Sequence, residues 1–357
     1  MRLNGLSYLC PGRPLDVRAL RAYAGPVAKR LLLFAVVLLS SAAIPAPADA
    51  GGAMRNGWLA YVTAIYPDSG DSQVEDYHLR LVRPGRPARL VAHGQDPAFS
   101  PDGRMLAFTR DDDHERRARG IWIARGDGSQ RRALTNSSDS LPVWSPGGGL
   151  IAFVRYASGE QLFVIKPNGT GKRRLGKTTE NASIAWSPTA RQLAFDGDDG
   201  GIFIHGSQGL RRVAASAGEV QWSSRGTLSF RRGGSLIVLD AQGAEHTLAT
   251  GLAIASDIED DRPYDWSPDG RRVVFSRTAG IFVTNADGTH AREVASGGAR
   301  PRWAPDGRTI FYERPYAGVY GVSAKGGKPR LLVKARRTCD EDCANLIYGG
   351  DWQPLTR

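Results

Sequence analysis

The stretch Trp266-Ser-Pro-Asp-Gly270 decides the fold, because close copies of it recur through most of the 357-residue chain. Each copy joins an aromatic residue to a small residue and then to residues typical of a tight turn. The copies begin at Phe99, Trp144, Trp186, Trp222, Trp266 and Trp303, and a shortened one, Trp352-Gln-Pro354, lies near the C-terminus. Successive aromatic residues are 36 to 49 positions apart, which indicates a repeated structural unit.

The repeated phrase has the chemistry of a hairpin turn between two strands. Proline presets φ at the first corner, aspartate tolerates the second, and glycine accepts the positive φ that follows. An alternating apolar run comes after each turn, as in residues 105–110 (MLAFTR) and 150–155 (LIAFVR). A third run, such as 120–125 (GIWIAR), a second glycine turn and a fourth run complete the unit. Four strands per repeat predict an all-β fold, a β-propeller of four-stranded blades.

The N-terminal part of the repeat region begins in the middle of a unit. Residues 58–65 match a second strand, 77–82 a third and 88–92 a fourth, so the first strand is missing there. The shortened phrase at Trp352 would supply it from the other end of the chain. We therefore predict seven blades, closed into a ring by the C-terminal strand pairing with the N-terminal blade. Six blades plus an unclosed unit is the alternative.

These phrases resemble the WD-like repeats of the TolB β-propeller family, whose unit has an aromatic residue, Ser-Pro-Asp-Gly and an Ile-Ala-Phe strand. The resemblance covers nearly all of residues 57–354 and implies a propeller fold and secretion. Two copies depart from the pattern: Trp222-Ser-Ser-Arg-Gly226 lacks the proline, and Trp186-Ser-Pro-Thr-Ala190 lacks the glycine. No counterpart of the α/β domain that precedes the TolB propeller is expected, so the role of TolB in the Tol–Pal envelope system is not carried over.

The first fifty residues have the composition of a secretory signal peptide. Lys29 and Arg30 precede an apolar run over residues 31–44, and Ala48-x-Ala50 is a typical processing site. We expect residues 1–50 to be removed, with translation starting at Met1 or at Val27, and residues 51–357 to form a single domain. The run of 14 residues is shorter than the roughly 20 of a spanning helix, although an uncleaved anchor is the alternative. The expected location is secreted, periplasmic or otherwise extracytoplasmic.

The net charge of the chain decides little about its partner. The whole chain has a net charge of +11, from 47 basic and 36 acidic residues. Residues 1–50 hold six basic and two acidic residues, so the remainder carries 41 against 34, a net charge of +7. No basic block interleaved with aromatic residues suggests nucleic acid, and no stable membrane span is expected after cleavage. We expect a monomer that binds a protein or another cell-envelope ligand.

Acidic residues gather in the long segments that join second to third strands and one blade to the next. By strand order these segments lie on one face of a propeller, and they hold 24 of the 34 acidic residues after position 50. The predicted ligand-binding face comprises Asp96, Asp111, Asp112, Asp113, Asp139, Glu180, Glu219, Asp257, Glu259, Asp260, Asp261 and Asp351. Such carboxylates could hold Ca²⁺ or a cationic ligand. The alternative is that they only solvate the loops.

Catalytic and metal motifs are not evident. The chain has no G-x-S-x-G sequence, and its six histidines are scattered without a metal-ligand spacing. We therefore predict a binding or scaffold protein rather than an enzyme, with no cofactor unless Ca²⁺ binds. A propeller lyase or hydrolase that uses carboxylates around the central channel is the alternative function.

Two cysteines remain after the predicted cleavage site. Cys339 and Cys343 lie close together in the sequence, and an oxidising compartment favours a disulfide between them. Two free thiols are the alternative, since a zinc site would require two more ligands nearby.

Overall fold

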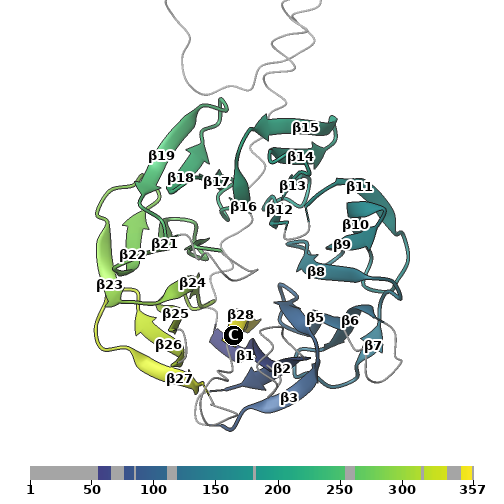
Figure 1. The fold of residues 1–357 in the computed structure, drawn as a ribbon, viewed down its shortest axis with the longest axis horizontal. Coiled ribbons are helices and arrows are strands. Elements are labelled where there is room, and N and C mark those ends of the chain that lie inside the picture. The colour runs from purple at the N-terminus through teal and green to yellow at the C-terminus, as the bar shows by residue number, and fades with distance from the viewer. Residues whose placement is uncertain are drawn as a thin grey trace, which may run out of the picture. The chain divides into compact units, whose positions relative to one another are not determined.

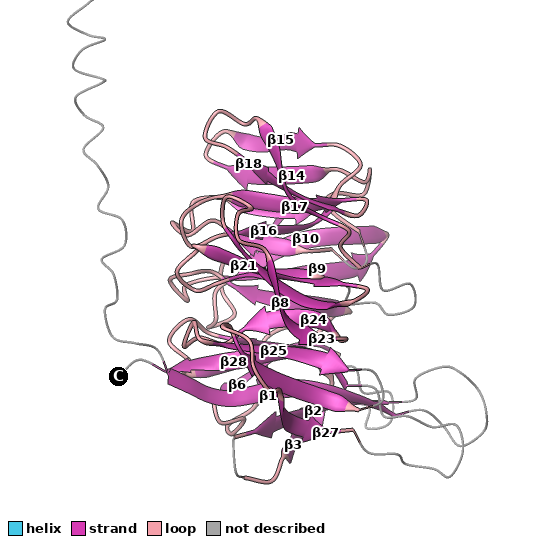
Figure 2. Cartoon of the chain, turned by 90° about the vertical axis from the view of Figure 1, so that its left-hand side faces the viewer, coloured by secondary structure: helices cyan, strands magenta, loops and turns pink. Residues whose placement is uncertain are grey.

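The computed structural model describes residues 55–65, 76–83, 86–110, 119–179, 182–253, 262–314, 317–335 and 347–355. These residues form strands joined by turns and loops, and no helix occurs among them (Figure 2). Within the same residues nothing has the length and apolarity of a membrane-spanning helix. The predicted signal peptide, residues 1–50, lies outside the described residues.

Seven four-stranded antiparallel sheets are arranged in a ring (Figure 1). The predicted seven-bladed propeller is therefore confirmed, and the six-bladed alternative is excluded. We name the sheets blades A to G in the order in which the chain fills them. Blade A contains β28 (Ile347–Leu355), β1 (Arg55–Ile65), β2 (Asp76–Val82) and β3 (Arg89–His93).

The other six blades each use four consecutive strands. Blade B contains β4 (Gln95–Phe99), β5 (Met105–Arg110), β6 (Gly120–Arg125) and β7 (Arg132–Ala133). Blade C contains β8 (Asp139–Trp144), β9 (Ile151–Ala157), β10 (Gly159–Ile165) and β11 (Arg173–Lys177). Blade D contains β12 (Ile184–Trp186), β13 (Leu193–Asp196), β14 (Ile202–Gly206) and β15 (Gly209–Ala214).

Blades E, F and G complete the ring. Blade E contains β16 (Gly218–Trp222), β17 (Leu228–Arg232), β18 (Ser235–Leu239) and β19 (Glu245–Thr250). Blade F contains β20 (Tyr264–Trp266), β21 (Arg272–Arg277), β22 (Gly280–Asn285) and β23 (Arg292–Ser296). Blade G contains β24 (Ala299–Trp303), β25 (Thr309–Arg314), β26 (Gly318–Ser323) and β27 (Arg330–Lys334). The first strand of a blade is the one nearest the ring axis (Figure 1).

The C-terminal strand closes the ring, as the sequence predicted. β28 pairs antiparallel with β1, and Leu59 lies opposite Trp352. The side chain of Gln353 adds a second link, because its Oε1 accepts a hydrogen bond from the Trp58 backbone N–H at 3.1 Å. Its Nε2 donates to the carbonyl oxygen of Gly103 in blade B at 2.7 Å. The strand β28 therefore completes blade A by pairing with β1, and it also connects blade A to blade B.

The core consists of seven apolar clusters, one at each seam between neighbouring blades. At the seam between blades A and G, Trp352 packs 6.0 Å from Phe311, measured between ring centroids. The second strands contribute fully buried aromatic residues around the ring: Phe108, Phe153, Phe195, Phe230, Phe275 and Tyr312. Trp144, Trp266, Trp303 and Trp352 are buried, whereas Trp122, Trp186 and Trp222 remain half-buried at the seams.

The turn in the repeated phrase has one geometry in its complete and incomplete copies. In blade B the Gly103 N–H donates to the Ser100 carbonyl at 2.8 Å, and Gly103 has a φ of 69°. In blade D, Ala190 takes the glycine position and adopts a φ of 56°, with its N–H 2.8 Å from the Ser187 carbonyl oxygen. A Cβ in this left-handed region is strained, so Ala190 destabilises the fold locally.

Replacing Ala190 by glycine should raise the free energy of unfolding by about 1 kcal/mol, because glycine adopts this φ without strain. Gly148→Ala is the matched reverse change, since Gly148 has a φ of 68° in the same turn of blade C and an added Cβ would meet nothing closer than 3.9 Å. The free energy of unfolding of Gly148→Ala should fall by a similar amount, about 1 kcal/mol. Thermal unfolding of both variants provides the measurement. Unfolding temperatures that shift in the same direction in the two variants would contradict the claim that a Cβ is strained in this turn.

Candidate functional site

The first strands of blades B, C, E and G carry a β-bulge near the end where the long segments enter, and in blade A the register shifts between Tyr348 and Gly350 of β28. Register shifts occur between Gln95 and Ala98 in blade B, and at the matching places in blades C, E and G. The bulges contain non-glycine residues with positive φ: Asp96 (52°), Leu141 (55°), Glu219 (58°) and Arg300 (49°). Bulges with strained residues re-aim side chains and are frequent beside functional sites. We call this end of the ring axis the long-loop end.

Charged side chains at the bulges pair with the second strand of the same blade. In blade C the carboxylate of Asp139, with 0% of its side chain exposed, accepts two hydrogen bonds from Arg155, at 2.6 and 2.8 Å. In blade E, Glu219 accepts a hydrogen bond from Arg231 Nε at 2.6 Å. Blade G reverses the order, since Arg300 of the first strand pairs with Glu313 of the second. Each pair neutralises its own charge and holds the bulge in place.

Asp96 occupies the corresponding position in blade B and is half-buried. Its Oδ2 accepts a hydrogen bond from the Thr109 hydroxyl at 2.7 Å and from the Leu141 N–H of blade C at 3.3 Å. Three residues of the predicted ligand-binding face, Asp96, Asp139 and Glu219, therefore lie at the long-loop end of first strands. They are engaged in contacts within the ring rather than presented only to solvent.

Two further carboxylates join the first strands of neighbouring blades. Asp351 of β28 accepts a hydrogen bond from the Phe99 N–H of blade B at 2.6 Å, and Asp265 of β20 accepts one from the Trp303 N–H of blade G at 2.7 Å. Both residues directly precede the aromatic residue of their own repeat. Burial raises the pKa of Asp351 to about 6 and also raises the pKa of Asp265, although Arg302 and Arg262 lower the latter.

Asp196, at the end of β13, lies at the seam between blades D and E. Its Oδ2 accepts hydrogen bonds from the Ser183 N–H at 3.2 Å and from the Glu219 N–H at 3.0 Å. Its Oδ1 is buried, and no donor in the described part of the chain reaches it. Burial raises the pKa of Asp196 to about 6. A desolvated carboxylate with one oxygen unpaired costs stability, so this position is not explained by folding alone.

The ionisation of Asp196 predicts a pH dependence of stability. In an unfolded chain an aspartate titrates near 3.9, so between about pH 4 and pH 6 the folded protein binds the extra proton. The stabilising contribution of this group is therefore present below pH 4 and lost as the pH rises through 6. Asp196→Asn should remove that loss and raise the free energy of unfolding at pH 7.5 by about 1–3 kcal/mol.

Urea unfolding of the wild type and of Asp196→Asn at pH 5 and pH 7.5 measures this effect. Comparing the two proteins cancels the titration of Asp351, which falls in the same pH range. The exposed Asp287 lies at a tight turn on the opposite face, and Asp287→Asn is the control. If Asp196→Asn were less stable than the wild type by the same amount at pH 5 and at pH 7.5, the claim that the pKa of Asp196 is raised would be contradicted.

The remaining predicted site residues lie outside the described residues. They are Asp111, Asp112, Asp113, Glu180, Asp257, Glu259, Asp260 and Asp261, and the cysteines Cys339 and Cys343 of the expected disulfide. Their part in ligand binding, the binding of Ca²⁺ and the disulfide stay predictions. Asp265 was not selected from the sequence, although its place before Trp266 matches that of Asp351 before Trp352.

The histidines that are scattered in the sequence are not all separate in the structure. His78 of β2 and His93 of β3 lie opposite each other in the register of blade A, and Asp76 lies beside them. The pattern of residues gave no sign of this group, because the pairing depends on the register between β2 and β3. The sequence predicted neighbouring third and fourth strands here, but not the register that brings the two histidines together.

Comparisons with known proteins identify the repeats. No protein-family profile matches the chain. An alignment 101 positions long, which covers 24% of the chain, is 38% identical to the Tol-Pal system protein TolB of Gluconobacter oxydans (strain 621H). The repeats are TolB-like. An alignment 110 positions long, which covers 29% of the chain, is 32% identical to the uncharacterized peptidase YuxL of Bacillus subtilis (strain 168).

These matches cover only part of the curated relatives. The aligned stretches span 22% of the TolB protein and 16% of YuxL, so the TolB-like likeness concerns repeats and not the activity of either whole protein. Among solved structures, puromycin hydrolase matches with a TM-score of 0.59 at 14% identity, over 81% of this chain and 54% of the hydrolase. At that identity the likeness shows the propeller fold alone. TolB-like propellers thus share their fold with enzymes.

Proposed function

We propose that this protein is an extracytoplasmic binding protein that holds a protein or another cell-envelope ligand at the long-loop end of its TolB-like propeller. The proposal rests on the N-terminal sequence of residues 1–50, which has the features of a signal peptide. It also rests on the fold, because closed propellers present loops from every blade at one end of a rigid scaffold.

The observation that carries the proposal is the carboxylate of Asp196 at the seam between blades D and E. It is buried, its pKa is raised to about 6, and its Oδ1 meets no donor among the described residues. Asp351 and Asp265 add two more desolvated carboxylates on first strands around the same axis. Lysine or arginine side chains of a partner bound over this end of the ring would lower the cost of keeping these buried groups ionised through their charge, without touching the carboxylates.

Binding is favoured over catalysis because the charged pairs at the bulges are structural. The carboxylate of Asp139 is held by Arg155 and that of Glu219 by Arg231, whereas a general acid or base must be able to reach a substrate. The lyase or hydrolase alternative requires an unpaired carboxylate pair at the same end, and no observation favours a particular pair.

Affinity capture from a cell-envelope extract tests the proposal. The wild-type protein should retain a partner at a fixed stoichiometry, and the double variant Asp196→Asn/Asp351→Asn should retain at least 10-fold less. Asp287→Asn, which alters the opposite face, should retain as much as the wild type. Equal capture by all three proteins would place the partner elsewhere, and chemical turnover of the captured material would replace the proposal with an enzymatic one.

A further inference from the structure

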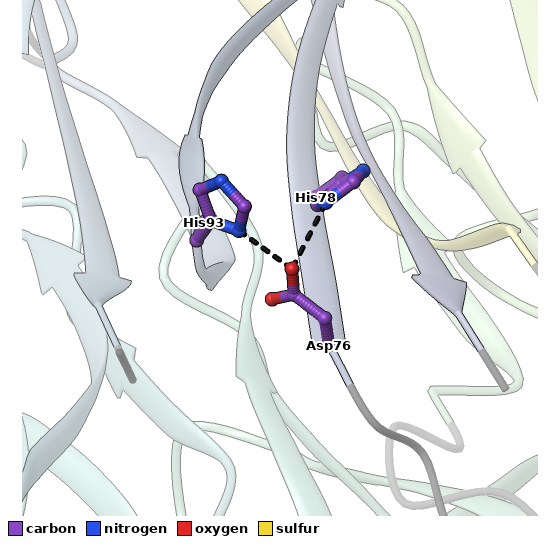
Figure 3. A group of neighbouring side chains, drawn as sticks. All are labelled: Asp76, His78 and His93. Carbon is purple, nitrogen blue, oxygen red and sulfur yellow. Dashed lines mark hydrogen bonds and ion pairs between the residues drawn. The ribbon is translucent and has the colours of Figure 1, made fainter. Parts of the chain in front are cut away.

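We propose that Asp76, His78 and His93 on blade A form a binding site for Zn²⁺ or a similar divalent transition metal. Figure 3 shows the three side chains converging from β2 and β3. The Asp76 Oδ2 lies 3.0 Å from His78 Nε2 and 2.5 Å from His93 Nδ1. One ligand atom from each residue lies within 4.8 Å of the others. The imidazole rings are 4.8 Å apart between centroids and meet edge to face, at 88°.

The backbone of blade A places these side chains together. Asp76 and His78 are two residues apart on one strand, so they share a face of the sheet, and His93 lies directly opposite His78 in the register. Val82 is on the same face by the same alternation and packs in the cluster between blades A and G. The group is therefore at a seam, with 17% of the His78 side chain and 42% of the His93 side chain exposed.

The backbone at His93 is held in place by the residue that follows it. The Gly94 N–H donates to the Tyr77 carbonyl oxygen at 2.6 Å, which ties the end of β3 to the start of β2. Gly94 has a φ of 150°, and a Cβ at this position would meet the Thr109 carbonyl oxygen of blade B at 2.1 Å. Only glycine therefore fits where the chain crosses from blade A to blade B. The hairpin of β2 and β3 brings the three ligands together before any ion binds, which reduces the entropic cost of binding.

The chemistry of the three donors selects the class of metal. Two imidazole nitrogens and one carboxylate oxygen suit Zn²⁺ and its neighbours among the divalent transition metals, whereas Ca²⁺ and Mg²⁺ prefer oxygen ligands throughout. Ligand atoms about 2.1 Å from one ion lie about 3.0–3.5 Å apart. The His78–Asp76 separation already fits, and the His93–Asp76 contact must lengthen by less than about 1 Å. His93 can make that movement because it is partly exposed.

The neighbouring positive charge of Arg80 affects how tightly the site would bind Zn²⁺. The Arg80 Nη2 is 3.4 Å from His78 Nδ1, a long contact. Metal binding at Nε2 would place the remaining ring proton on Nδ1 and break this contact. Arg80→Gln should therefore bind the metal at least as tightly as the wild type.

Titration calorimetry with ZnCl₂ tests the site in the full-length protein, purified without a histidine tag and stripped with EDTA. We expect one Zn²⁺ per chain with a dissociation constant in the micromolar range or below, and no comparable heat with CaCl₂. Co²⁺ should add visible absorption bands of a site with nitrogen and oxygen ligands. The variants His93→Gln and His78→Gln should each weaken Zn²⁺ binding at least 10-fold.

A matched control comes from the exposed pair of blade E, in which His246 Nε2 lies 2.9 Å from Asp240 Oδ2. This pair contains one histidine, whereas the proposed site contains two. His246→Gln removes a similar histidine–aspartate contact and should leave Zn²⁺ binding unchanged. The proposal is overturned by a folded wild-type protein that binds no Zn²⁺, or by His93→Gln and His78→Gln variants that bind it with wild-type affinity. In that case the three side chains form only a hydrogen-bonded cluster. Capture of the envelope partner is tested with other variants, so the two proposals fail separately.

Discussion

Removing residues 350–357 should destabilise the protein by at least about 3–5 kcal/mol, the value expected for loss of one buried tryptophan alone. The truncation deletes Trp352, which is 5% exposed, and the two hydrogen bonds that Gln353 makes with Trp58 and Gly103. It also leaves β1 as an open sheet edge, which favours aggregation. Thermal unfolding and size-exclusion chromatography of the truncated protein provide the measurement.

The point variant Trp352→Ala separates loss of the side chain from loss of the strand. Trp186→Ala is its matched control, because Trp186 occupies the same place in blade D but is half-buried. The first variant should lose more stability than the second, and less than the truncation. A truncated protein that unfolds at the wild-type temperature would show that the ring does not depend on β28.

Breaking the pair between Asp139 and Arg155 should cost about 3–5 kcal/mol, because the change Arg155→Met leaves a carboxylate buried without its partner. The Asp139 side chain is 0% exposed, and Arg155 also lies 5.0 Å above the ring of Phe163. Methionine keeps the apolar part of this contact, so the decrease in the free energy of unfolding comes mainly from the lost positive charge of Arg155. The double variant Asp139→Asn/Arg155→Met should recover most of the loss.

A double-mutant cycle measured by urea unfolding gives the coupling energy of the pair. We expect about 3 kcal/mol, far above the value for an exposed salt bridge. The exposed pair Arg232 and Glu245 of blade E, with side chains 36% and 38% exposed, is the control and should give less than about 1 kcal/mol. A coupling energy near zero for Asp139 and Arg155 would remove the claim that the bulge charges are structural.

The repeated phrase predicted the fold because its information is local. The turn around Pro268 and Gly270 and the strand after it repeat in each unit, so counting the copies gave seven blades. The unmatched phrase at Trp352 predicted closure for the same reason. Ala190 shows the limit of this local information, since hydrogen bonds of the turn impose a positive φ on a residue that does not favour it.

The site could be predicted only in part because its contacts depend on register across strands. Asp96, Asp139, Glu219 and Asp351 were selected as acidic residues of the predicted ligand-binding face, and the structure places all four on first strands of blades. The arginine partners and the bulges were not foreseen, because a bulge shifts register by one residue and leaves no pattern in the sequence. His78 and His93 were missed because fourteen residues separate them in the chain.

Carbodiimide cross-linking of the captured partner, followed by mass spectrometry, tests the central claim most directly. This reagent joins a carboxylate to a lysine in contact with it, so each cross-link reports which end of the ring is covered. We predict cross-links from carboxylates at the long-loop end, such as Asp96, to lysines of the partner. Cross-links confined to the tight-turn face, at Asp102, Asp127 or Asp287, would contradict binding at the long-loop end.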